Sequence, residues 1–265
     1  MPYDAHIHLD HYAPAQLDEM LRASFASGVD GVVAVSMGLA SCEANRALAR
    51  RYPGRVLPAY GRHPEQPPLA EDELEALCAW IAALPGDEAF AIGEVGLPYF
   101  NRTAAESSGL SFDSAPYFRQ LERFAALAAE LDRPIVLHAV QEDTEAVIDL
   151  LERFGVRKAH FHWWKGSAQA VSRLIAGGYY VSVTPEVRYD EETRALARIY
   201  PLERLLVETD GPWPFEGPYA GMRTEPWMVL DSIREIAALR GLDEEDVRAA
   251  LDANTRSCYA IGGQG

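Results

Sequence analysis

The chain has 265 residues, of which 40 are acidic and 24 are basic, so its formal net charge is −16 and its isoelectric point is about 4.8. This balance argues against sequence-independent binding of duplex nucleic acid, which depends on a basic surface, although a bound metal cation can still attract a polyanion. Three widely spaced cysteines, Cys42, Cys78 and Cys258, form no CxxC pair, so disulfides and cysteine–zinc sites are not expected and a reducing cytoplasm is predicted. No apolar run is long enough to cross a membrane, and the first residues lack the basic and apolar regions of a secretory signal.

Strand-like and helix-like segments alternate from the start of the chain. A helix at 14–27 is indicated by Leu17, Met20, Leu21 and Phe25, which recur on one helical face, and Gly28 is placed to end it. The first half predicts strands at 3–8, 31–36, 56–60 and 89–94 and further helices at 41–52, 71–84 and 114–131, with a polar loop before the last helix.

The second half repeats this pattern and ends in additional helices. It predicts strands at 134–138, 158–162, 179–183 and 204–209, helices at 144–154, 167–176 and 191–199, a Gly/Pro-rich loop at 211–221, and terminal helices at 225–240, 243–253 and 255–261. Eight buried strands separated by helices fit a closed (β/α)₈ TIM barrel of the α/β class with extra C-terminal helices. An open doubly wound sheet is the alternative, but no glycine-rich phosphate loop follows the first strand. Since no linker or repeat divides the chain, residues 1–265 are expected to form a single domain.

Potential metal ligands lie at the ends of these predicted strands. His6 and His8 are two positions apart in the first strand, so their side chains point to the same face. Each such residue alone has an ordinary interpretation: a hydrogen-bonded histidine, a capping carboxylate or a turn-forming aspartate. Taken together, these residues favour a shared metal site, because a barrel brings the C-terminal ends of all its strands to one rim. The other strand ends contribute His63, Glu94, His138, His162 and Asp210.

The number and type of these side chains predict two divalent ions. Imidazole nitrogens and carboxylate oxygens are ligands of Zn²⁺, Mn²⁺ and related ions, and imidazole-rich sites disfavour Mg²⁺ without excluding it. Four histidines and two carboxylates exceed what one tetrahedral ion with an open position needs, but they suit two ions that share a carboxylate. We expect His6, His8, Glu94 and Asp210 around one ion and Glu94, His138 and His162 around the other, with Glu94 as the bridge.

Several sequence blocks resemble the signature motifs of the TatD-type metal-dependent hydrolases. These blocks follow the family's order over nearly the whole chain: DAHIHLD at 4–10, GRHP at 61–64, AIGEVGL at 91–97, PIVLH at 134–138, ETDGP at 208–212 and NTR at 254–256. The resemblance implies an amidohydrolase-like TIM barrel whose better-known members are cytoplasmic deoxyribonucleases, some with 3′→5′ exonuclease activity. It also implies the same six metal ligands, and it implies that His63 contacts the scissile phosphate.

Two departures from the family pattern lie near the expected substrate. Pro98 stands where the family usually has Asp, and the sixth-strand motif His-Cys-Phe-Ser-Gly is replaced by HWWKG at 162–166. Both changes bear on the substrate more than on the metal ligands.

The first functional hypothesis is metal-assisted hydrolysis of a phosphodiester at the ends of single-stranded DNA or in a small phosphoester. The ions would activate a water, Asp210 would accept its proton, and His63, assisted by Arg62 or Lys165, would stabilise the charge on the phosphate. Trp163 and Trp164 are expected either to stack bases or to form a hydrophobic lid over the barrel.

Two other hypotheses use the same residues differently. In the second, the metal site activates water against the carbonyl of an amide, ester or lactone in a small neutral molecule, which suits the acidic chain. In the third, the chain is a metal-binding scaffold without activity, against which the complete ligand set argues. The sequence indicates no obligate protein partner and no membrane association.

Overall fold

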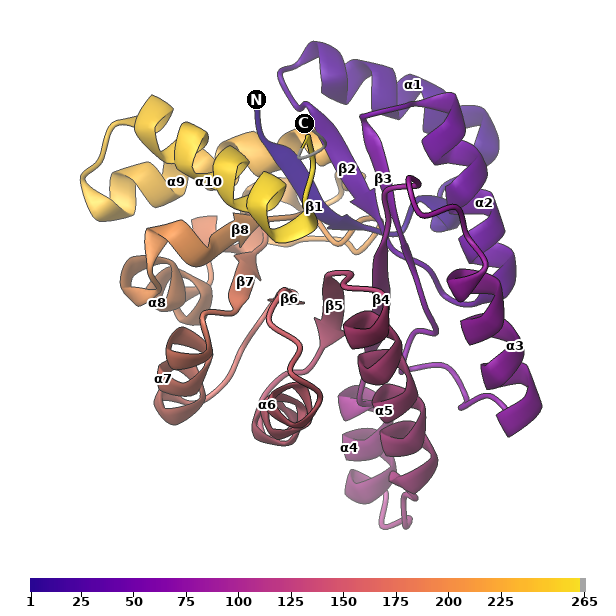
Figure 1. Cartoon of the computed structure of the whole chain (residues 1–265). Helices are drawn as coiled ribbons and strands as arrows, with labels where there is room; N and C mark the ends of the chain where they lie inside the picture. The colour runs from indigo at the N-terminus through magenta and orange to yellow at the C-terminus, as the bar shows by residue number, and fades with distance from the viewer. Residues whose placement is uncertain (263–265) are drawn as a thin grey trace.

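The structure is a computed structural model that describes residues 1–262, and it confirms the predicted TIM barrel (Figure 1). Eight parallel strands form one sheet in the order of the sequence, and the helices surround it. The strands are β1 Tyr3–Ile7, β2 Gly31–Ala34, β3 Val56–Tyr60, β4 Ala91–Gly96, β5 Ile135–His138, β6 Ala159–Phe161, β7 Tyr180–Val183 and β8 Leu205–Val207. The helices are α1 Pro14–Ala26, α2 Leu39–Arg51, α3 Glu71–Ala82, α4 Tyr99–Ser107, α5 Ala115–Glu130, α6 Asp143–Phe154, α7 Ala168–Gly177, α8 Glu191–Ile199, α9 Val229–Arg240 and α10 Glu244–Tyr259.

The first and last strands meet where the barrel closes. Just beyond β8, the Asp210 N–H donates to the His6 carbonyl (2.9 Å) and the His8 N–H donates to the Gly211 carbonyl (2.8 Å). The buried Asp4 carboxylate accepts two more hydrogen bonds across the seam, from the Thr209 N–H (2.9 Å) and hydroxyl (2.5 Å). This closure places the two ends of the sequence, His6 and His8 on one side and Asp210 on the other, next to each other.

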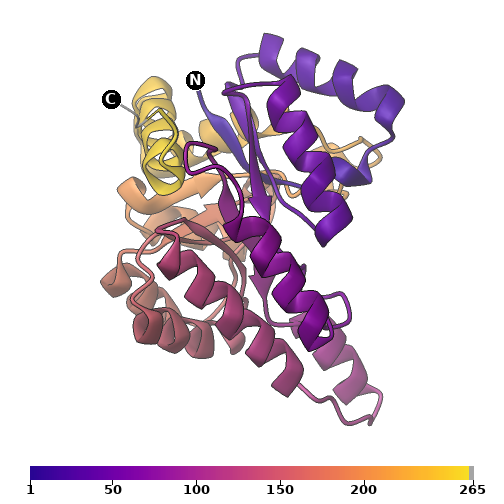
Figure 2. The same cartoon turned by 45° about the vertical axis from the view of Figure 1, so that its right-hand side comes forward.

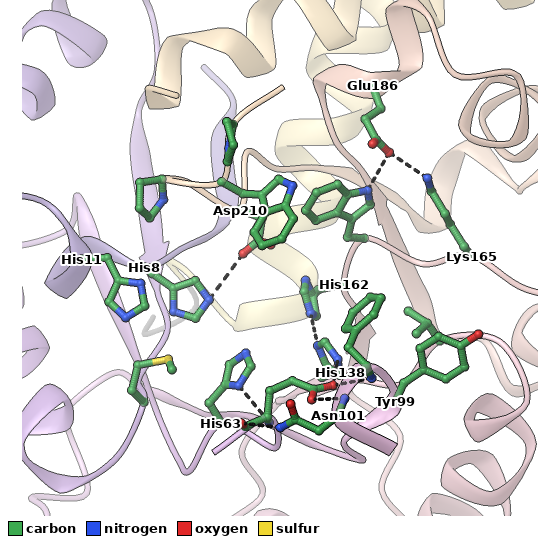
Figure 3. A pocket seen from close by; sticks show the side chains of 18 of the residues that line it. His8, His11, His63, Tyr99, Asn101, His138, His162, Lys165, Glu186 and Asp210 are labelled. Carbon is green, nitrogen blue, oxygen red and sulfur yellow. Dashed lines mark hydrogen bonds and ion pairs between the residues drawn. The ribbon is translucent and has the colours of Figure 1, made fainter. Parts of the chain in front are cut away.

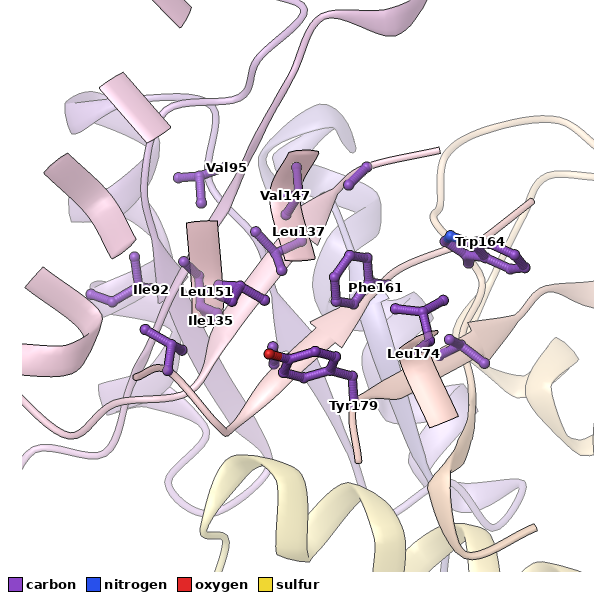
Figure 4. Close-up of a cluster of buried hydrophobic side chains, with 14 of the residues drawn as sticks. Ile92, Val95, Ile135, Leu137, Val147, Leu151, Phe161, Trp164, Leu174 and Tyr179 are labelled. Atoms are coloured by element: carbon purple, nitrogen blue, oxygen red, sulfur yellow. The ribbon is translucent and has the colours of Figure 1, made fainter. Parts of the chain in front are cut away.

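Side chains that alternate along the strands divide into two buried layers. In β5, Ile135 and Leu137 join the large cluster that packs against the helices (Figure 4), whereas Val136 joins a different cluster. Because neighbouring residues of a strand point to opposite faces, this second cluster lies inside the barrel. Tyr259 of α10 belongs to the inner cluster, and both views show α10 beside the start of β1 (Figures 1 and 2). The helix α10 therefore covers the N-terminal end of the barrel and leaves the opposite rim for the polar strand ends.

Two predicted segments differ from the structure. The polar loop after β4 contains the helix α4, which has no buried residue, so no apolar stripe was available to reveal it. The two predicted helices at 243–253 and 255–261 are the single helix α10, which runs through Asn254 without a break. The Asn254 amide donates to the carbonyls of Leu202 and Leu205, so it fastens the helix to the start of β8 and the turn before it instead of ending the helix.

The three cysteines are buried and unpaired, as expected for small apolar residues. Within residues 1–262, no helix is long and apolar enough to span a membrane.

Candidate metal centre

The predicted strand-end residues converge on one cavity at the C-terminal rim of the barrel. The cavity has a volume of about 860 Å³, and its wall includes His8, His63, His138, His162 and Asp210 (Figure 3). His138 is the last residue of β5, and the other four lie in the segments that follow β1, β3, β6 and β8. The barrel topology thus assembles residues that are up to 202 positions apart in the sequence, from His8 to Asp210.

Glu94 of β4 lies at the centre of this cluster and is fully buried. Its Oε2 atom lies 3.2 Å from His6 Nε2 and 3.3 Å from His8 Nε2. Its Oε1 atom lies 2.9 Å from His138 Nδ1 and 2.7 Å from His162 Nε2. Each carboxylate oxygen therefore faces its own pair of imidazoles, which is the arrangement that a bridging carboxylate requires.

Asp210 completes the first of these groups. Its Oδ1 atom lies 3.3 Å from His6 Nε2 and 3.4 Å from His8 Nε2. The backbone of Asp210 is in the left-handed region (φ +48°), which aspartate tolerates better than most residues. The next residue must be small, because a Cβ on Gly211 would lie 2.0 Å from the Tyr12 hydroxyl. Local geometry therefore directs the Asp210 carboxylate toward the two histidines.

Two glutamates that sequence reasoning missed lie behind the histidines. Glu65 Oε1 is 3.3 Å from His138 Nε2, and Glu208 Oε1 is 3.4 Å from His162 Nδ1. Carboxylates in this position orient an imidazole and raise its basicity toward a metal. A signal was present in the sequence, because Glu65 follows His63 by two positions and Glu208 precedes Asp210 by two.

Both glutamates are themselves held by hydrogen bonds. Glu65 accepts the N–H groups of Phe100 (2.8 Å) and Asn101 (2.9 Å) in the first turn of α4. Glu208 accepts the Ser182 hydroxyl (2.6 Å) and the Trp163 N–H (2.7 Å). The helix α4 is thus connected through Glu65 to His138.

The residues of the cluster fit divalent cations. Several buried ligand atoms have no hydrogen-bond partner within the described chain, and the cost of burying such polar atoms unpaired is high. The atoms that face the proposed ions and have no such partner are His6 Nε2, Glu94 Oε2 and Asp210 Oδ1. Five three-residue groups of the described chain have ligand atoms within 4.8 Å of one another: His6–His8–Asp210, Glu94–His138–His162, His8–His63–Glu94, His6–His162–Glu208 and the more exposed His8–Asp10–His11. Nitrogen and carboxylate oxygen donors of this kind suit Zn²⁺ or Mn²⁺.

The pKa shifts in the cluster also favour a bound cation. Burial opposes ionisation of Glu94, but the imidazoles of His162, His63 and His6 outweigh it and hold its pKa well below the usual value. Burial also disfavours a charged His8, yet Asp210 and Glu94 raise the pKa of His8 to about 10. The carboxylates thus attract positive charge strongly, and a divalent cation can supply that charge in place of protons.

His63 differs from the other histidines. Its Nδ1 atom accepts the Glu65 N–H (3.1 Å), which leaves the ring proton on Nε2, 3.4 Å from Glu94 Oε2. Burial lowers the pKa of His63 to about 4, so the ring is neutral at neutral pH. This tautomer presents an N–H donor to the cavity and no free nitrogen lone pair.

The remaining predicted substrate contacts divide into those in the cavity and those outside it. Trp163 and Lys165 line the cavity, but Trp164 is 3% exposed and its indole N–H donates to Thr144 Oγ1 (3.0 Å) within the main core. The expectation that Trp164 stacks bases is therefore wrong. The expected role of Arg62 is also not supported, because its guanidinium donates to the carbonyls of Pro67 and Met37 and Arg62 is absent from the described cavity wall.

The two histidines outside the predicted set have different surroundings. His160 of β6 is fully buried, and its nitrogens lie 2.6 Å from the Tyr259 hydroxyl and 2.7 Å from Ser182 Oγ, so both are occupied by structural hydrogen bonds. His11 lines the cavity and stacks on His8 with ring centroids 5.1 Å apart.

Comparison with known proteins agrees with this architecture. The family model described as TatD related DNase matches residues 3–260. An uncharacterized metal-dependent hydrolase of Haemophilus influenzae is 34% identical over 98% of this chain and 100% of its own length. A 3′–5′ ssDNA/RNA exonuclease TatD of Escherichia fergusonii is 29% identical over 92% of this chain and 93% of its own length.

A solved structure shows the same fold. The TatD homologue YJJV of Escherichia coli superposes with a TM-score of 0.83 and 25% identity, covering 98% of both chains. The family model and these relatives extend over nearly the whole chain. The chain therefore belongs to the TatD-related DNase family of metal-dependent hydrolases.

Proposed function

We propose that this protein is a phosphodiesterase that uses two divalent ions to hydrolyse single-stranded nucleic acid from its ends. The observation that carries the proposal is the position of Glu94, whose two oxygens face separate histidine pairs 2.7 to 3.3 Å away. Paired ions that share a carboxylate suit displacement at phosphorus, because they stabilise both the attacking and the leaving oxygen. The ssDNA/RNA exonuclease name of a relative that aligns over 92% of this chain supports the same class of bond.

In this proposal, the ligands are divided as follows. His6, His8 and Asp210 together with Glu94 would hold one ion, and His138 and His162 together with Glu94 would hold the other. Bound divalent ions lower the pKa of water toward neutrality and offset charge on the phosphoryl oxygens. Imidazole-rich groups favour Zn²⁺ or Mn²⁺ over Mg²⁺. The buried, unpaired cysteines are consistent with activity in the cytoplasm.

The side chains at the cavity surface would move and hold protons. Burial opposes ionisation of Asp210, but the adjacent imidazoles of His6 and His8 hold its pKa below the usual value, so the carboxylate is ionised and can accept a proton from the attacking water. His63 would donate its Nε2–H to a phosphoryl oxygen, because its Nδ1 is already used by the Glu65 N–H. This division makes Asp210 the base and His63 the hydrogen-bond donor to the substrate.

A labelled-strand assay tests the proposal. Metal-stripped protein is incubated with an end-labelled single-stranded oligonucleotide, and Mg²⁺, Mn²⁺ or Zn²⁺ is added back in parallel with an Asp210→Asn variant. We expect stepwise shortening that requires metal and is lost in the variant. Intact DNA and RNA with every metal, although metal is bound, would exclude the phosphodiesterase.

One observation favours a second candidate. The cavity wall includes many apolar side chains, among them Met37, Phe100, Val140 and Pro212, and such a wall also suits a small neutral ester, amide or lactone. A panel of carbonyl substrates run with the same metal-loaded protein separates the two. Hydrolysis of a carbonyl substrate without any phosphodiester cleavage would establish this second function.

A further inference from the structure

We propose that the cavity binds only the terminal one or two nucleotides of a strand, by stacking a base on Trp213 at its mouth, and that it does not hold the backbone of a longer strand. This inference rests on the proposed phosphodiesterase function and specifies its substrate. It predicts that short fragments, down to dinucleotides, are cleaved as well as long strands.

The charge of the cavity wall is the first argument. Among the described residues that line the cavity, Lys165 is the only lysine or arginine. Its ammonium already lies 3.0 Å from a Glu186 carboxylate oxygen and 3.6 Å from one of Asp190. Proteins that hold several nucleotides of a single strand use a positively charged groove along the backbone. This wall has no unpaired Lys or Arg side chain for phosphates away from the metal cluster, and the chain as a whole carries −16 charges.

The neighbouring arginines do not supply a free positive charge for further phosphates either. The Arg62 guanidinium donates to two backbone carbonyls, those of Pro67 and Met37. Arg102 of α4 lies 2.8 Å from Asp143 and 3.1 Å from Glu142. Each guanidinium is therefore already bound by oxygen atoms of the protein, and the metal cluster is the main source of positive charge for one phosphate.

The mouth of the cavity offers aromatic surface instead of charge. Trp213, in the loop after β8, and Phe100, in the first turn of α4, line the cavity with 59% and 58% of their surfaces exposed. The Trp163 ring meets Trp213 edge to face, with centroids 6.0 Å apart and planes at 76°. The Trp163 indole N–H donates to Glu186 (2.8 Å), which fixes this ring as a support and leaves Trp213 as the exposed stacking surface. Base stacking on an exposed aromatic ring is independent of sequence.

The position of Trp213 in the chain and the volume of the cavity both place the stacked base close to the metal cluster. Trp213 follows the proposed base, Asp210, by three residues. Its backbone N–H donates to the Asp210 carbonyl (3.1 Å), and this turn keeps the two residues close together. A base on Trp213 would thus belong to a nucleotide adjoining the phosphate at the cluster. The cavity volume of about 860 Å³ is that of a site for a small organic molecule, roughly 300–1,000 Å³, and not of an extended groove.

Chain-length and salt dependence test the inference. The metal-loaded protein is given oligothymidylates of roughly 2, 4, 8 and 16 nucleotides at salt concentrations from about 50 to 300 mM, and kcat/KM per strand end is measured. We expect kcat/KM to vary by less than about threefold with length, and a log–log salt slope shallower than about −0.7, the value for one phosphate of a single strand. A rise of more than tenfold from the dinucleotide to the longest strand, or a slope steeper than about −2, would overturn the inference.

Variants of the stacking surface provide a second test. Replacing Trp213 by Ala should raise KM for the dinucleotide about tenfold with kcat changed by less than about threefold, and Trp213→Phe should restore most of the loss. Phe118→Ala removes another exposed aromatic ring, on α5 and outside the described cavity wall, and should leave KM unchanged. Quenching of tryptophan fluorescence by a non-hydrolysable phosphorothioate dinucleotide should weaken in Trp213→Ala. Equal KM and equal quenching in Trp213→Ala and wild type would refute the stacking role.

The two proposals fail in different ways. If no phosphodiester of any length is cleaved, the proposed function is wrong. If long strands are cleaved and dinucleotides are not, the phosphodiesterase stands and only this inference is wrong.

Discussion

The contact between Glu65 and His138 gives the most specific prediction about the metal centre. The Glu65 carboxylate accepts two backbone N–H groups of α4, at 2.8 and 2.9 Å, and faces His138 Nε2 at 3.3 Å. A glutamine at this position has one oxygen and one NH₂ group, so it cannot accept from both backbone amides and the imidazole, and its NH₂ group would face at least one of these donors. Glu65→Gln should therefore leave His138 less firmly oriented and less basic.

The expected magnitude follows from the position of Glu65 behind the imidazole. Loss of a carboxylate that orients a ligand histidine typically weakens metal binding by about 10- to 100-fold, which is about 1.4 to 2.7 kcal/mol. Only the ion at His138 and His162 should be affected, because the contacts of His6 and His8 to Glu94 Oε2 do not involve Glu65. Competition with a zinc chelator should then show one weakened and one unchanged affinity.

A matched control is available on the same helix. Glu106→Gln replaces a half-exposed glutamate of α4 that pairs with Arg102 at 3.7 Å, and metal binding should not change. Hydrogen exchange at the amides of Phe100 and Asn101 should accelerate in Glu65→Gln alone. Wild-type affinity for both ions, with unchanged exchange at those amides, would refute the proposed orienting role.

Three further predictions concern the substrate contact, the core and an ion pair. His63→Ala should lower phosphodiester turnover by about 10- to 1,000-fold without changing metal content, and loss of an ion on elemental analysis would instead show that His63 is a ligand. Phe161→Ala should lower the free energy of unfolding by about 3 to 5 kcal/mol in a urea titration, because Phe161 is fully buried in the main core; a loss below about 1 kcal/mol would contradict that packing. The hydrogen bond from Arg46 holds the pKa of Glu88 below 4.5, so this ion pair stabilises the fold above that pH. The difference in melting temperature between wild type and Glu88→Gln should therefore disappear as the pH falls below 4.5. A gap independent of pH would show that the Glu88 charge contributes nothing.

Much of the fold could be predicted because its signals are local. The strand at Val56–Tyr60 and the helix at Glu191–Ile199 begin and end where the sequence predicts, since a short buried apolar run and helical periodicity depend only on nearby residues. The helix α4 was missed because it buries no residue, and α10 was divided because the fixing role of Asn254 depends on carbonyls 49 and 52 positions away.

The candidate site could be predicted in its ligand types but not in its supporting contacts. Two considerations were sufficient to predict the main cluster: the spacing of His6 and His8, and the fact that the C-terminal ends of all barrel strands lie at one rim. The two adjacent tryptophans could not be distinguished, because Trp163 has φ +35° and this local turn, invisible in the sequence, sends Trp164 into the core. The spacing of Glu65 from His63 could not identify the partner of this carboxylate, because His138 lies on β5, 73 positions further along the chain.

The number of ions held per chain tests the central claim most directly. Purified protein reconstituted with Zn²⁺ or Mn²⁺ is freed of excess metal, and bound metal is counted by elemental analysis for wild type and for Glu94→Gln, with anomalous scattering from crystals to locate the ions. We predict two ions per chain in the wild type, one on each side of Glu94, and the loss of at least one of them in Glu94→Gln. A single ion per chain, retained with equal affinity in Glu94→Gln, would contradict the bridged two-ion centre on which the proposed mechanism depends.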